Sequence, residues 1–507
     1  MIIVVDYGSQ VSHLIARRIR SLGVYAELVP PSITAEKIRK MNPEGIILSG
    51  GPKSVYEKDA FKVDRRILGL GIPVLGICYG HQLLAHTLGG KVIPGSKEYG
   101  KEILSAKKSQ LLKGLGKHEQ VWVSHGDSVV KLPEGYEAVG STDDCKIAAF
   151  ENTRKRIYGV QFHPEVQHTT NGMKILDNFI EICGDKRDYS IKGLDRKIVA
   201  EIKKAVGKEA LIMGVSGGVD SLVASVLIKR ATPNLYCVFV DHGLIRKKEQ
   251  EEVAELYKNL GFSHFLMIDA SMLFISRLKG VADPEKKRKI IGKTFIEVFE
   301  KKVDELKKRH HIRFLGQGTI YPDRIESAKS SEQAAVIKTH HNVGGLPDKM
   351  KLRLVEPLKD LYKDEVRELG KLLGIKKELL WRHPFPGPGL AVRILGEVTP
   401  ERVNILREAD AIFTEELKKS GYYNKTWQAF AALLPVKAVG VMGDARAYGY
   451  IIALRAVTST DAMTADWARL PDELLERISA RITKKVRGVT RVVYDITQKP
   501  PATIEYE

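Results

Sequence analysis

The sequence is poor in cysteine and has no long apolar run, and both absences restrict what the protein can be. Four of the 507 residues are cysteine, Cys78, Cys145, Cys183 and Cys237, and no two are spaced as CxxC. This pattern disfavours a disulfide framework or a zinc site and fits a reducing cytosol. The sequence also shows no bilayer-spanning stretch and no signal peptide at Met1. We therefore expect a cytoplasmic protein with no membrane partner.

The excess of basic residues does not by itself indicate nucleic-acid binding. The formal net charge is +19, with 28% of residues charged. Lysines and arginines alternate with acids, as in residues 301–305, and there is no long basic tail and no aromatic RNA-binding motif. We expect no nucleic-acid partner, and we interpret the surplus as the surface of a basic protein that handles several phosphates.

The order of apolar and polar segments predicts three domains, in keeping with 507 residues at roughly 150 per domain. Residues 1–188 alternate short apolar strands with amphipathic helices, and residues 189–383 repeat that alternation after a polar linker. Three prolines within 384–388 end the second unit, and residues 384–507 are smaller and mixed. The predicted fold is α/β: two doubly wound parallel-sheet domains followed by a smaller α+β domain.

Short apolar runs bounded by glycine or polar residues give the expected strands. In the first domain they lie at 2–6, 24–29, 45–49, 73–77 and 157–162. In the second they lie at 210–215, 235–240, 264–269 and 312–316. The third has strands near 436–442, 450–457 and 491–497 and a helix near 472–486. Alternation of strands with helices in the first two domains predicts mostly parallel sheets covered on both faces.

A cysteine stands where an apolar strand turns into a helix. Residues 73–77 are apolar, and Cys78 follows them with Gly76 and Gly80 on either side. This is the G-x-nucleophile-x-G elbow, with sulfur in place of the serine oxygen. The helix N-terminus favours the thiolate, which is the reactive form. The pattern predicts that Cys78 is a nucleophile.

The groups that such a nucleophile needs follow later in the chain. His163 and Glu165 come directly after an expected strand, where open α/β sheets place their sites. His163 would take the proton of Cys78, and Glu165 would fix the tautomer of the imidazole. A lone cysteine or histidine is more often structural, but an elbow followed by this pair predicts a catalytic triad. Backbone N–H groups would form an oxyanion hole at Gly50, Gly51 and Tyr79.

These segments resemble the class I, triad-type, glutamine amidotransferase domain. The matching stretches are 6–10, 49–52, 76–82 and 161–165. The resemblance implies a γ-glutamyl thioester on Cys78 and release of ammonia from L-glutamine. Residues 124–127, Ser-His-Gly-Asp, also resemble a family stretch that lines the glutamine pocket.

A second motif predicts a phosphate site. A glycine-rich loop joins the strand 211–215 to a helix that begins at Leu222, so that several N–H groups point at one spot. The loop lacks the Gly-Lys-[Ser/Thr] ending of a P-loop and instead resembles the PP-loop of ATP pyrophosphatases, which adenylylate a substrate oxygen and expel pyrophosphate. The predicted ATP-binding residues are Ser216, Gly217, Gly218, Val219, Asp220 and Ser221.

Expulsion of pyrophosphate predicts a divalent cation, because the charge on the leaving group must be neutralised. We expect Mg²⁺ bound together with ATP, with Asp220 and Asp323 as candidate ligands. No organic prosthetic group is expected.

The segments outside the loop indicate the acceptor, because they resemble glutamine-hydrolysing GMP synthetases. The matching stretches are 241–246, 321–327, 338–347, 383–390 and 499–507. The resemblance implies that the domains are an amidotransferase (1–188), an ATP pyrophosphatase (189–383) and a dimerisation domain (384–507). It implies the substrates ATP, XMP and L-glutamine and a homodimer. The implied XMP contacts are Arg246, Gln428, Asp444, Lys499 and Glu505, and the implied mobile lid over 338–347 includes Lys338, His340 and His341.

Two alternatives remain. An ATP-dependent tRNA thiolase or amidase would fit the positive charge and the PP-loop, but it would need a CxxC pair or a persulfide cysteine near that loop, where Cys237 stands alone. A glutamine sensor or nucleotide-binding module without chemistry should lack the nucleophile or the loop serine, and Cys78 and Ser216 are both present.

Overall fold

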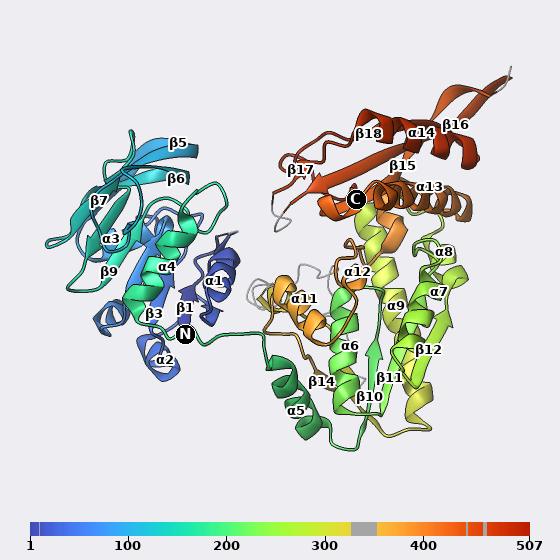
Figure 1. Cartoon of the computed structure of the whole chain (residues 1–507), viewed down its shortest axis with the longest axis horizontal. Coiled ribbons are helices and arrows are strands. Elements are labelled where there is room, and N and C mark those ends of the chain that lie inside the picture. Colours follow the sequence, from blue (N-terminus) through green and yellow to red (C-terminus); the bar gives the residue numbers. More distant parts are fainter. Residues whose placement is uncertain (10, 326–351, 443–444, 460–463) are drawn as a thin grey trace. The chain divides into compact units, whose positions relative to one another are not determined.

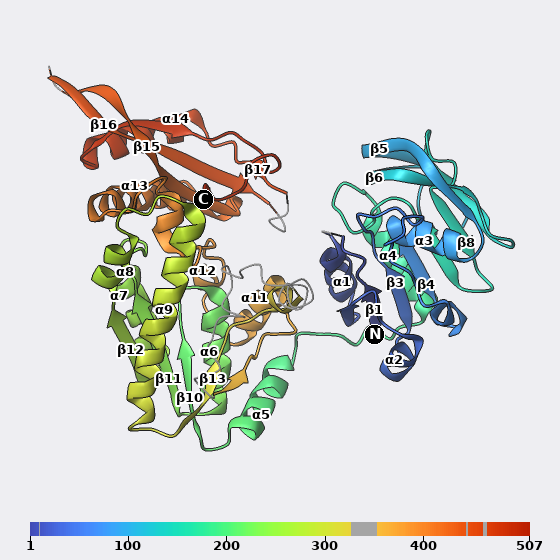
Figure 2. The ribbon, with the colours of Figure 1, turned by 180° about the vertical axis from the view of Figure 1, so that it is seen from behind.

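The computed structural model describes residues 1–507 except 10, 326–351, 443–444 and 460–463. The chain divides into two compact units, Met1–Ser190 and Ile191–Glu507 (Figures 1 and 2). One hydrophobic core in the second unit contains residues from both sides of position 383, among them Ile212 and Ile452. The domain boundaries at 188 and 383 stay predictions.

The first unit is built on a nine-stranded sheet with the order β2-β1-β3-β4-β9-β8-β7-β5-β6. Its first five strands are parallel: β2 (Ala26–Val29), β1 (Ile2–Val5), β3 (Gly45–Leu48), β4 (Val74–Ile77) and β9 (Ile157–Val160). These are the strands expected from sequence, and β1, β3, β4 and β9 are buried along their whole length. The helices of this unit are α1 (Ser12–Ser21), α2 (Ala35–Met41), α3 (Tyr79–Thr87) and α4 (Gly172–Cys183), with the 3₁₀ helix η1 at Arg65–Gly69.

Four antiparallel strands extend this sheet beyond what the sequence indicated (Figure 1). They are β5 (Lys91–Ala106), β6 (His118–Lys131), β7 (Glu137–Ser141) and β8 (Ala149–Asn152). Strand β6 alternates buried and exposed positions over much of its length, as a strand with one wet face does. The sheet is therefore mixed, and helix α3 packs against β5 and β6 as well as against β3, β4 and β9.

The second unit begins with a parallel five-stranded sheet in the order β12-β11-β10-β13-β14. The strands are β10 (Ala210–Gly214), β11 (Leu235–Asp241), β12 (His264–Asp269), β13 (Ile312–Gly316) and β14 (Arg353–Val355). The helices are α5 (Leu194–Val206), α6 (Val219–Ala231), α7 (Glu249–Asn259), α8 (Ser271–Leu278), α9 (Pro284–Lys307), α11 (Lys363–Leu372) and α12 (Lys377–Leu380). Every strand expected here is present, and the mixed α/β class is confirmed.

The same unit ends in a long antiparallel hairpin with helices packed on it. Strands β15 (Gln428–Met442) and β16 (Ala445–Thr458) form the hairpin, while β17 (Asp466–Trp467) and β18 (Val489–Tyr494) also pair with β16. The remaining helices are η3 (Gly389–Arg393), α13 (Pro400–Lys419), η4 (Tyr423–Lys425) and α14 (Asp472–Lys485). Among the described residues, no helix combines the length and the apolarity needed to traverse a bilayer.

Candidate active sites

The elbow forms as the sequence predicts. Cys78 joins β4 to α3 with φ 53° and ψ −106°, a backbone conformation that a non-glycine residue seldom adopts and that turns its side chain out of the strand. Glycines on both sides make the turn possible. A Cβ on Gly76 would lie 2.5 Å from the backbone of Gly80, and a Cβ on Gly80 would lie 2.2 Å from the carbonyl oxygen of Leu48 on β3. The close approach of α3 to the sheet therefore requires both glycines.

His163 and Glu165 lie together beside Cys78. The Nδ1 atom of His163 is 2.7 Å from Oε1 of Glu165, and both side chains are buried. Burial alone would lower the pKa of His163, but the carboxylate of Glu165 and the sulfur of Cys78 raise that pKa well above its ordinary value. The backbone of this pair is held in turn, since the N–H of His163 donates to the carbonyl oxygen of Trp122 at 2.9 Å. A positively charged imidazole beside a cysteine is the arrangement that favours thiolate.

The loop predicted to form the oxyanion hole, which contains Gly50 and Gly51, lies beside His163. A Cβ on Gly50 would lie 3.3 Å from Cε1 of His163, and a Cβ on Gly51 would lie 2.8 Å from the carbonyl oxygen of Tyr7. Any larger residue would therefore fill the space above the imidazole or push the loop away. Tyr79 is the first residue of α3, and its N–H belongs to the terminal turn that has no partner within the helix.

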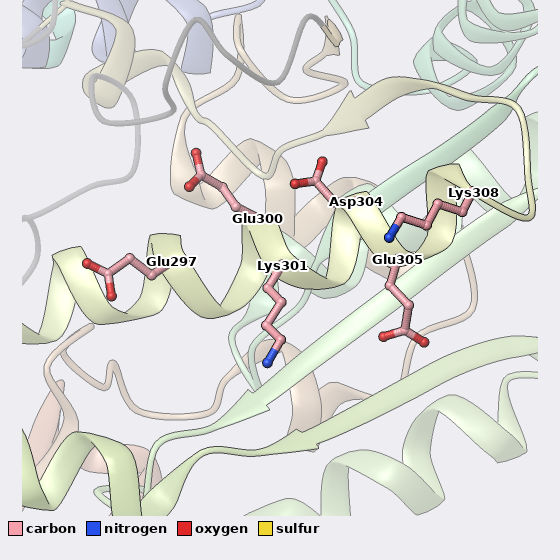
Figure 3. Close-up of a pocket in the computed structure, with 6 residues that line it drawn as sticks. All are labelled: Glu297, Glu300, Lys301, Asp304, Glu305 and Lys308. Carbon is pink, nitrogen blue, oxygen red and sulfur yellow. The ribbon is translucent and has the colours of Figure 1, made fainter.

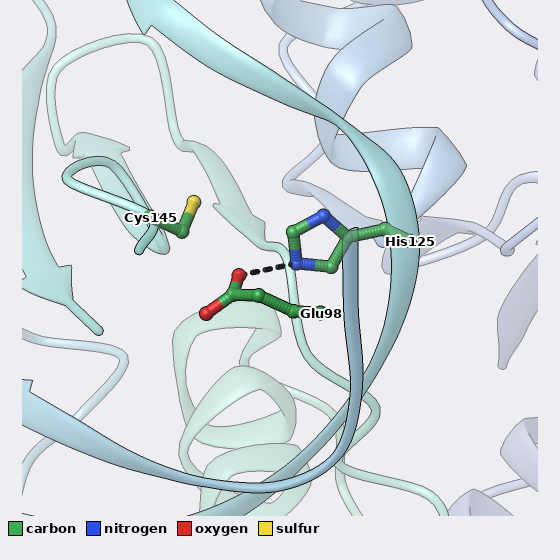
Figure 4. Close-up of side chains that lie close together, drawn as sticks. All are labelled: Glu98, His125 and Cys145. Atoms are coloured by element: carbon green, nitrogen blue, oxygen red, sulfur yellow. Dashed lines mark ion pairs between the residues drawn. The ribbon is translucent and has the colours of Figure 1, made fainter. Parts of the chain in front are cut away.

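Residues of strand β6 lie beside Cys78, and the sequence motifs predicted only part of this contact. The sulfur of Cys78 lies 3.7 Å from the carbonyl oxygen of Ser124 on β6. The next residue, His125, pairs with Glu98 of β5 through Nε2 and Oε2 at 2.8 Å, with both side chains almost fully buried (Figure 4). The neighbouring Asp127 accepts a 2.8 Å hydrogen bond from Tyr56 through Oδ1. Ser-His-Gly-Asp is thus fixed next to the nucleophile.

The hydrogen bonds around Glu98 and His125 show which atom of the imidazole carries a proton. Nδ1 of His125 lies 3.0 Å from the carbonyl oxygen of Asp127, which only accepts, so Nδ1 carries a proton. Thr142 donates to the other oxygen of Glu98 at 2.7 Å. Nε2 of His125 and Oε2 of Glu98 face each other at 2.8 Å, but neither atom has a partner in hydrogen-bond geometry among the described residues. Cys145 brings a third ligand-type atom within 4.8 Å of this pair (Figure 4).

The other three cysteines have surroundings that keep them unreactive. All four cysteines are free thiols. Burial raises the pKa of Cys145 to about 11 and that of Cys183 to about 12, and it also raises the pKa of Cys237. These three thiols stay protonated at neutral pH and are poor nucleophiles.

In the second unit, hydrogen bonds between Ser216, Gly218 and Ser221 hold the two ends of the PP-loop together. Oγ of Ser221 lies 3.0 Å from the carbonyl oxygens of Ser216 and Gly218, and 3.2 Å from Oγ of Ser216. The N–H of Gly218 donates to Ser216 at 3.3 Å. Helix α6 begins at Val219, so the loop and the first helical turn direct N–H groups to one place. The predicted phosphate residues are therefore brought together.

The carboxylates predicted to bind Mg²⁺ suit that role in part. Oδ1 of Asp220 is buried and has no hydrogen-bond partner among the described residues, while its Oδ2 pairs with Lys363. Asp323 uses one oxygen to accept from the N–H of Ile320 at 3.1 Å. The segment that leads to Asp323 abuts Asp220, because a Cβ on Gly318 would lie 3.0 Å from the carbonyl carbon of Asp220. A carboxylate oxygen with no partner beside a phosphate loop fits a hard cation.

Two of the residues expected to bind XMP meet at the carbonyl oxygen of Pro384, and a third, Glu505, is bonded to one of them. Nη2 of Arg246 donates to this oxygen at 3.3 Å, and Nε2 of Gln428 lies 3.4 Å from it. Gln428 also donates to Oε1 of Glu505 at 2.5 Å. The guanidinium of Arg246 stacks 4.3 Å above the ring of Phe385. This group has the donors, the acceptor and the aromatic face that a nucleotide requires.

Glu249 connects this group to the PP-loop. Its Oε1 lies 3.7 Å from Arg246 and 3.2 Å from Arg382, and a Cβ on Gly217 of the loop would lie 2.8 Å from the same oxygen. Sequence inspection missed Glu249 and Arg382. Arg382 directly precedes the His-Pro-Phe-Pro-Gly-Pro-Gly stretch, which was the available signal.

The remaining predicted residues are Lys499, Asp444 and those of the lid. Lys499 pairs through its backbone with Ala465, at 2.8 Å and 3.1 Å. Asp444 and the lid residues Lys338, His340 and His341 lie outside the described residues.

One hollow in the described part of the chain coincides with none of these groups. It has a volume of about 530 Å³ and is lined by charged side chains of α9 (Figure 3). The lining residues are Glu297, Glu300, Lys301, Asp304, Glu305 and Lys308. Binding sites for small molecules are mostly apolar and enclosed, so this surface has no feature that would select a ligand.

Comparison with known proteins gives matches at both ends and over the whole chain. Residues 3–183 match the family described as glutamine amidotransferase class-I, and residues 415–506 match the GMP synthase C terminal domain. A solved glutamine amidotransferase from Thermotoga maritima aligns with 37% of this chain and 98% of its own, at 18% identity and a TM-score of 0.29.

Two curated relatives align from end to end. The GMP synthase (glutamine-hydrolyzing) of Carboxydothermus hydrogenoformans is 57% identical over 100% of this chain and 99% of its own length. The protein of the same description from Aquifex aeolicus is 54% identical with the same coverage. The chain therefore belongs to the family of glutamine-hydrolysing GMP synthases.

Proposed function

We propose that the protein converts XMP to GMP, with ATP as the activating substrate and the amide of L-glutamine as the source of nitrogen. The observation that supports this most directly is the position of Glu249, which contacts Arg246 on one side and the PP-loop on the other. An acceptor site and a pyrophosphate-expelling loop that share one carboxylate are arranged for adenylylation. The buried Cys78–His163–Glu165 group in the other unit supports a separate source of ammonia.

In the glutamine reaction, Sγ of Cys78 attacks the amide carbon and forms a tetrahedral intermediate. The N–H groups of Gly50, Gly51 and Tyr79 stabilise its oxyanion. His163 then gives its proton to the departing nitrogen, and the C–N bond breaks to leave ammonia and a γ-glutamyl thioester. Water resolves the thioester to glutamate, with the imidazole as the base.

In the acceptor reaction, O2 of the xanthine base attacks the α-phosphorus of ATP, and the bond to the β-phosphate breaks. The leaving pyrophosphate is held by the N–H groups of the loop 216–221, with Arg382 close by to balance its charge. Ammonia then attacks C2 of the adenylylated base, and AMP departs with the oxygen. Products are GMP, AMP and pyrophosphate.

We further propose that Mg²⁺ accompanies ATP, held by Asp220, whose Oδ1 lacks a partner among the described residues, and by Asp323. When bound, the ion would neutralise charge on the departing pyrophosphate. Asp220 begins α6 within the loop itself, so its carboxylate is positioned by the same backbone that binds the phosphates.

We also propose a homodimer formed through residues 384–507. The hairpin of β15 and β16 exposes several large apolar side chains, and contiguous exposed apolar residues indicate contact surfaces. They are Val436, Val439, Val441 and Tyr448. Sedimentation of the intact chain should show a species of twice the chain mass.

The test is to mix the protein with XMP, MgATP and glutamine and to measure GMP, AMP and pyrophosphate. Equal amounts of the three products are expected. The Cys78→Ala variant should make no GMP from glutamine but should make it from ammonium at wild-type rates. Loss of ammonium-dependent synthesis in that variant would contradict the division of labour between the two sites.

A further inference from the structure

Three of the largest fully buried side chains in the described chain carry a positive charge. They are Lys287, Arg393 and Arg455, each with at most 1% of its surface exposed. Cations are rarely buried unless they are paired. All three contact the same short segment, residues 503–507, although they come from α9, η3 and β16. The second unit therefore places three buried cations around one stretch of chain.

All three hydrogen-bond donors of the Lys287 ammonium group are used within the protein. Its Nζ donates to the carbonyl oxygens of Ala391 at 3.2 Å and Ile394 at 2.7 Å and to Oε2 of Glu507 at 2.5 Å. An ammonium group has three donors, so none remains for another ligand. Burial lowers the pKa of Lys287 and raises the pKa of Glu507, which means that each charge depends on the other.

Arg455 holds the backbone of the same segment. Its Nε donates to the carbonyl oxygen of Ile504 and its Nη2 to that of Thr503, both at 2.8 Å. Its remaining nitrogen, Nη1, pairs with Asp495 at 2.8 Å. The guanidinium therefore fixes the path of the main chain and is itself compensated by a carboxylate.

Arg393 places the segment against the nucleotide group. It binds both carboxylate oxygens of Glu505, at 3.0 Å and 2.9 Å, and its guanidinium lies 5.1 Å from the ring of Phe385. Arg246 stacks on the same ring. Because Glu505 is also bonded to Gln428, the side chain lies within the group expected to bind XMP.

We propose that Lys287 and Arg455 are positioning residues for the acceptor nucleotide, which fix residues 503–507 so that Glu505 and Gln428 are presented to XMP in one arrangement. Neither residue would touch the nucleotide, since every donor on Lys287 and the donating edge of Arg455 are engaged by the protein. The inference rests on the proposed function, because it concerns how tightly XMP is bound.

The buried pair can be tested with a double-mutant cycle on the full-length protein. Lys287→Met leaves Glu507 and the carbonyl oxygens of Ala391 and Ile394 without their donor, and Glu507→Gln leaves the buried ammonium without its counter-charge. We expect each variant to raise the KM for XMP by about tenfold or more in ammonium-dependent synthesis. The double variant breaks the same bond as each single variant, so its KM for XMP should stay close to that of the worse single variant and should not reach the product of the two effects. Lys302→Met, which breaks an exposed pair with Glu305 on the same helix, is the control and should change nothing.

Arg455→Met is an independent variant and should raise the KM for XMP in the same way. Glutamine hydrolysis, which depends on the first unit, should stay at the wild-type rate in all variants. Unchanged KM values for XMP in Lys287→Met and Arg455→Met would overturn the proposal. So would a double variant whose KM for XMP rises by the product of the two single effects, because Lys287 and Glu507 would then act independently.

A measurement on the wild-type protein covers the case in which the variants do not fold. Lys287 is fully buried with every donor engaged, so it should resist an amine-reactive reagent before any nucleotide is added. Modification of Lys287 at the rate of an exposed lysine, with protection only after XMP binds, would overturn the proposal. Failure of the wild-type protein to make GMP would be seen separately and would concern the proposed function.

Discussion

Substitution of Gly80 by alanine tests whether the elbow depends on close contact between α3 and the sheet. The new Cβ would lie 2.2 Å from the carbonyl oxygen of Leu48, whereas such contacts ordinarily measure roughly 3.3 Å. Helix α3 must therefore move by about 1 Å, and the N–H of Gly80 would strain its 3.0 Å bond to Ser49. Overpacking of this kind costs about 1–3 kcal/mol.

The consequence for catalysis is larger than the consequence for stability. Cys78 precedes α3 directly, so a 1 Å shift of the helix moves the sulfur by a similar amount, and misplacement of that size costs roughly 100-fold in rate. We expect glutamine hydrolysis by Gly80→Ala to fall by about this factor, while ammonium-dependent synthesis is retained.

The assay measures glutamate release and ammonium-dependent GMP formation on the same preparation, with denaturant unfolding for stability. Gly292→Ala is the matched control: Gly292 is exposed on α9 with no atom within 4 Å of an added Cβ, and alanine favours a helix over glycine by about 1 kcal/mol. A wild-type rate of glutamate release by Gly80→Ala would refute the reasoning, because the position of Cys78 would then not depend on the close packing of α3 against β3.

Three further predictions concern the catalytic pair, the pocket wall and the loop. Because Glu165 raises the pKa of His163, Glu165→Gln should let the imidazole lose its proton at lower pH, so the alkaline limb of the pH profile for glutamine hydrolysis should shift to lower pH; an unmoved limb would contradict the pairing. Glu98→Gln keeps an acceptor for Thr142 and offers an amide N–H to Nε2 of His125, and should leave kcat/KM for glutamine within about threefold, while Glu98→Ala leaves the buried Thr142 hydroxyl without its acceptor and should lower it about tenfold; equal effects would show that these contacts are unimportant. Gly217→Ala places a Cβ 2.8 Å from a carboxylate oxygen and should raise the KM for ATP about tenfold with glutamine hydrolysis intact; a normal KM for ATP would remove this loop from the nucleotide site.

Much of the fold was predictable because its parallel strands are buried on both faces. Strands such as β3 and β10 are short continuous apolar runs, which stand out from the helices around them. Strands β5 and β6 were missed for the opposite reason. They have a wet face and many polar residues, and their pairing shifts register between Pro94 and Glu98. Such an interruption breaks the regular alternation of apolar and polar residues from which a strand is predicted.

The candidate sites divide in the same way. Cys78 and the loop 216–221 were predictable because local backbone geometry forces particular residues at fixed spacing. Arg393 and Lys287 were not, because their partners Glu505 and Glu507 lie 112 and 220 residues away. A lysine that will be buried looks the same in sequence as one on the surface, and only the fold brings its carboxylate to it.

Nitrogen must pass from glutamine, which reacts in the first unit, to the nucleotide, which binds in the second. The most direct measurement uses glutamine labelled with ¹⁵N at the amide, with unlabelled ammonium at low concentration in the buffer, and determines the mass of the GMP formed from XMP and MgATP. The account predicts ¹⁵N at the exocyclic amino group in the wild-type protein and none in Cys78→Ala. Unlabelled GMP made while labelled glutamine is being hydrolysed would contradict it.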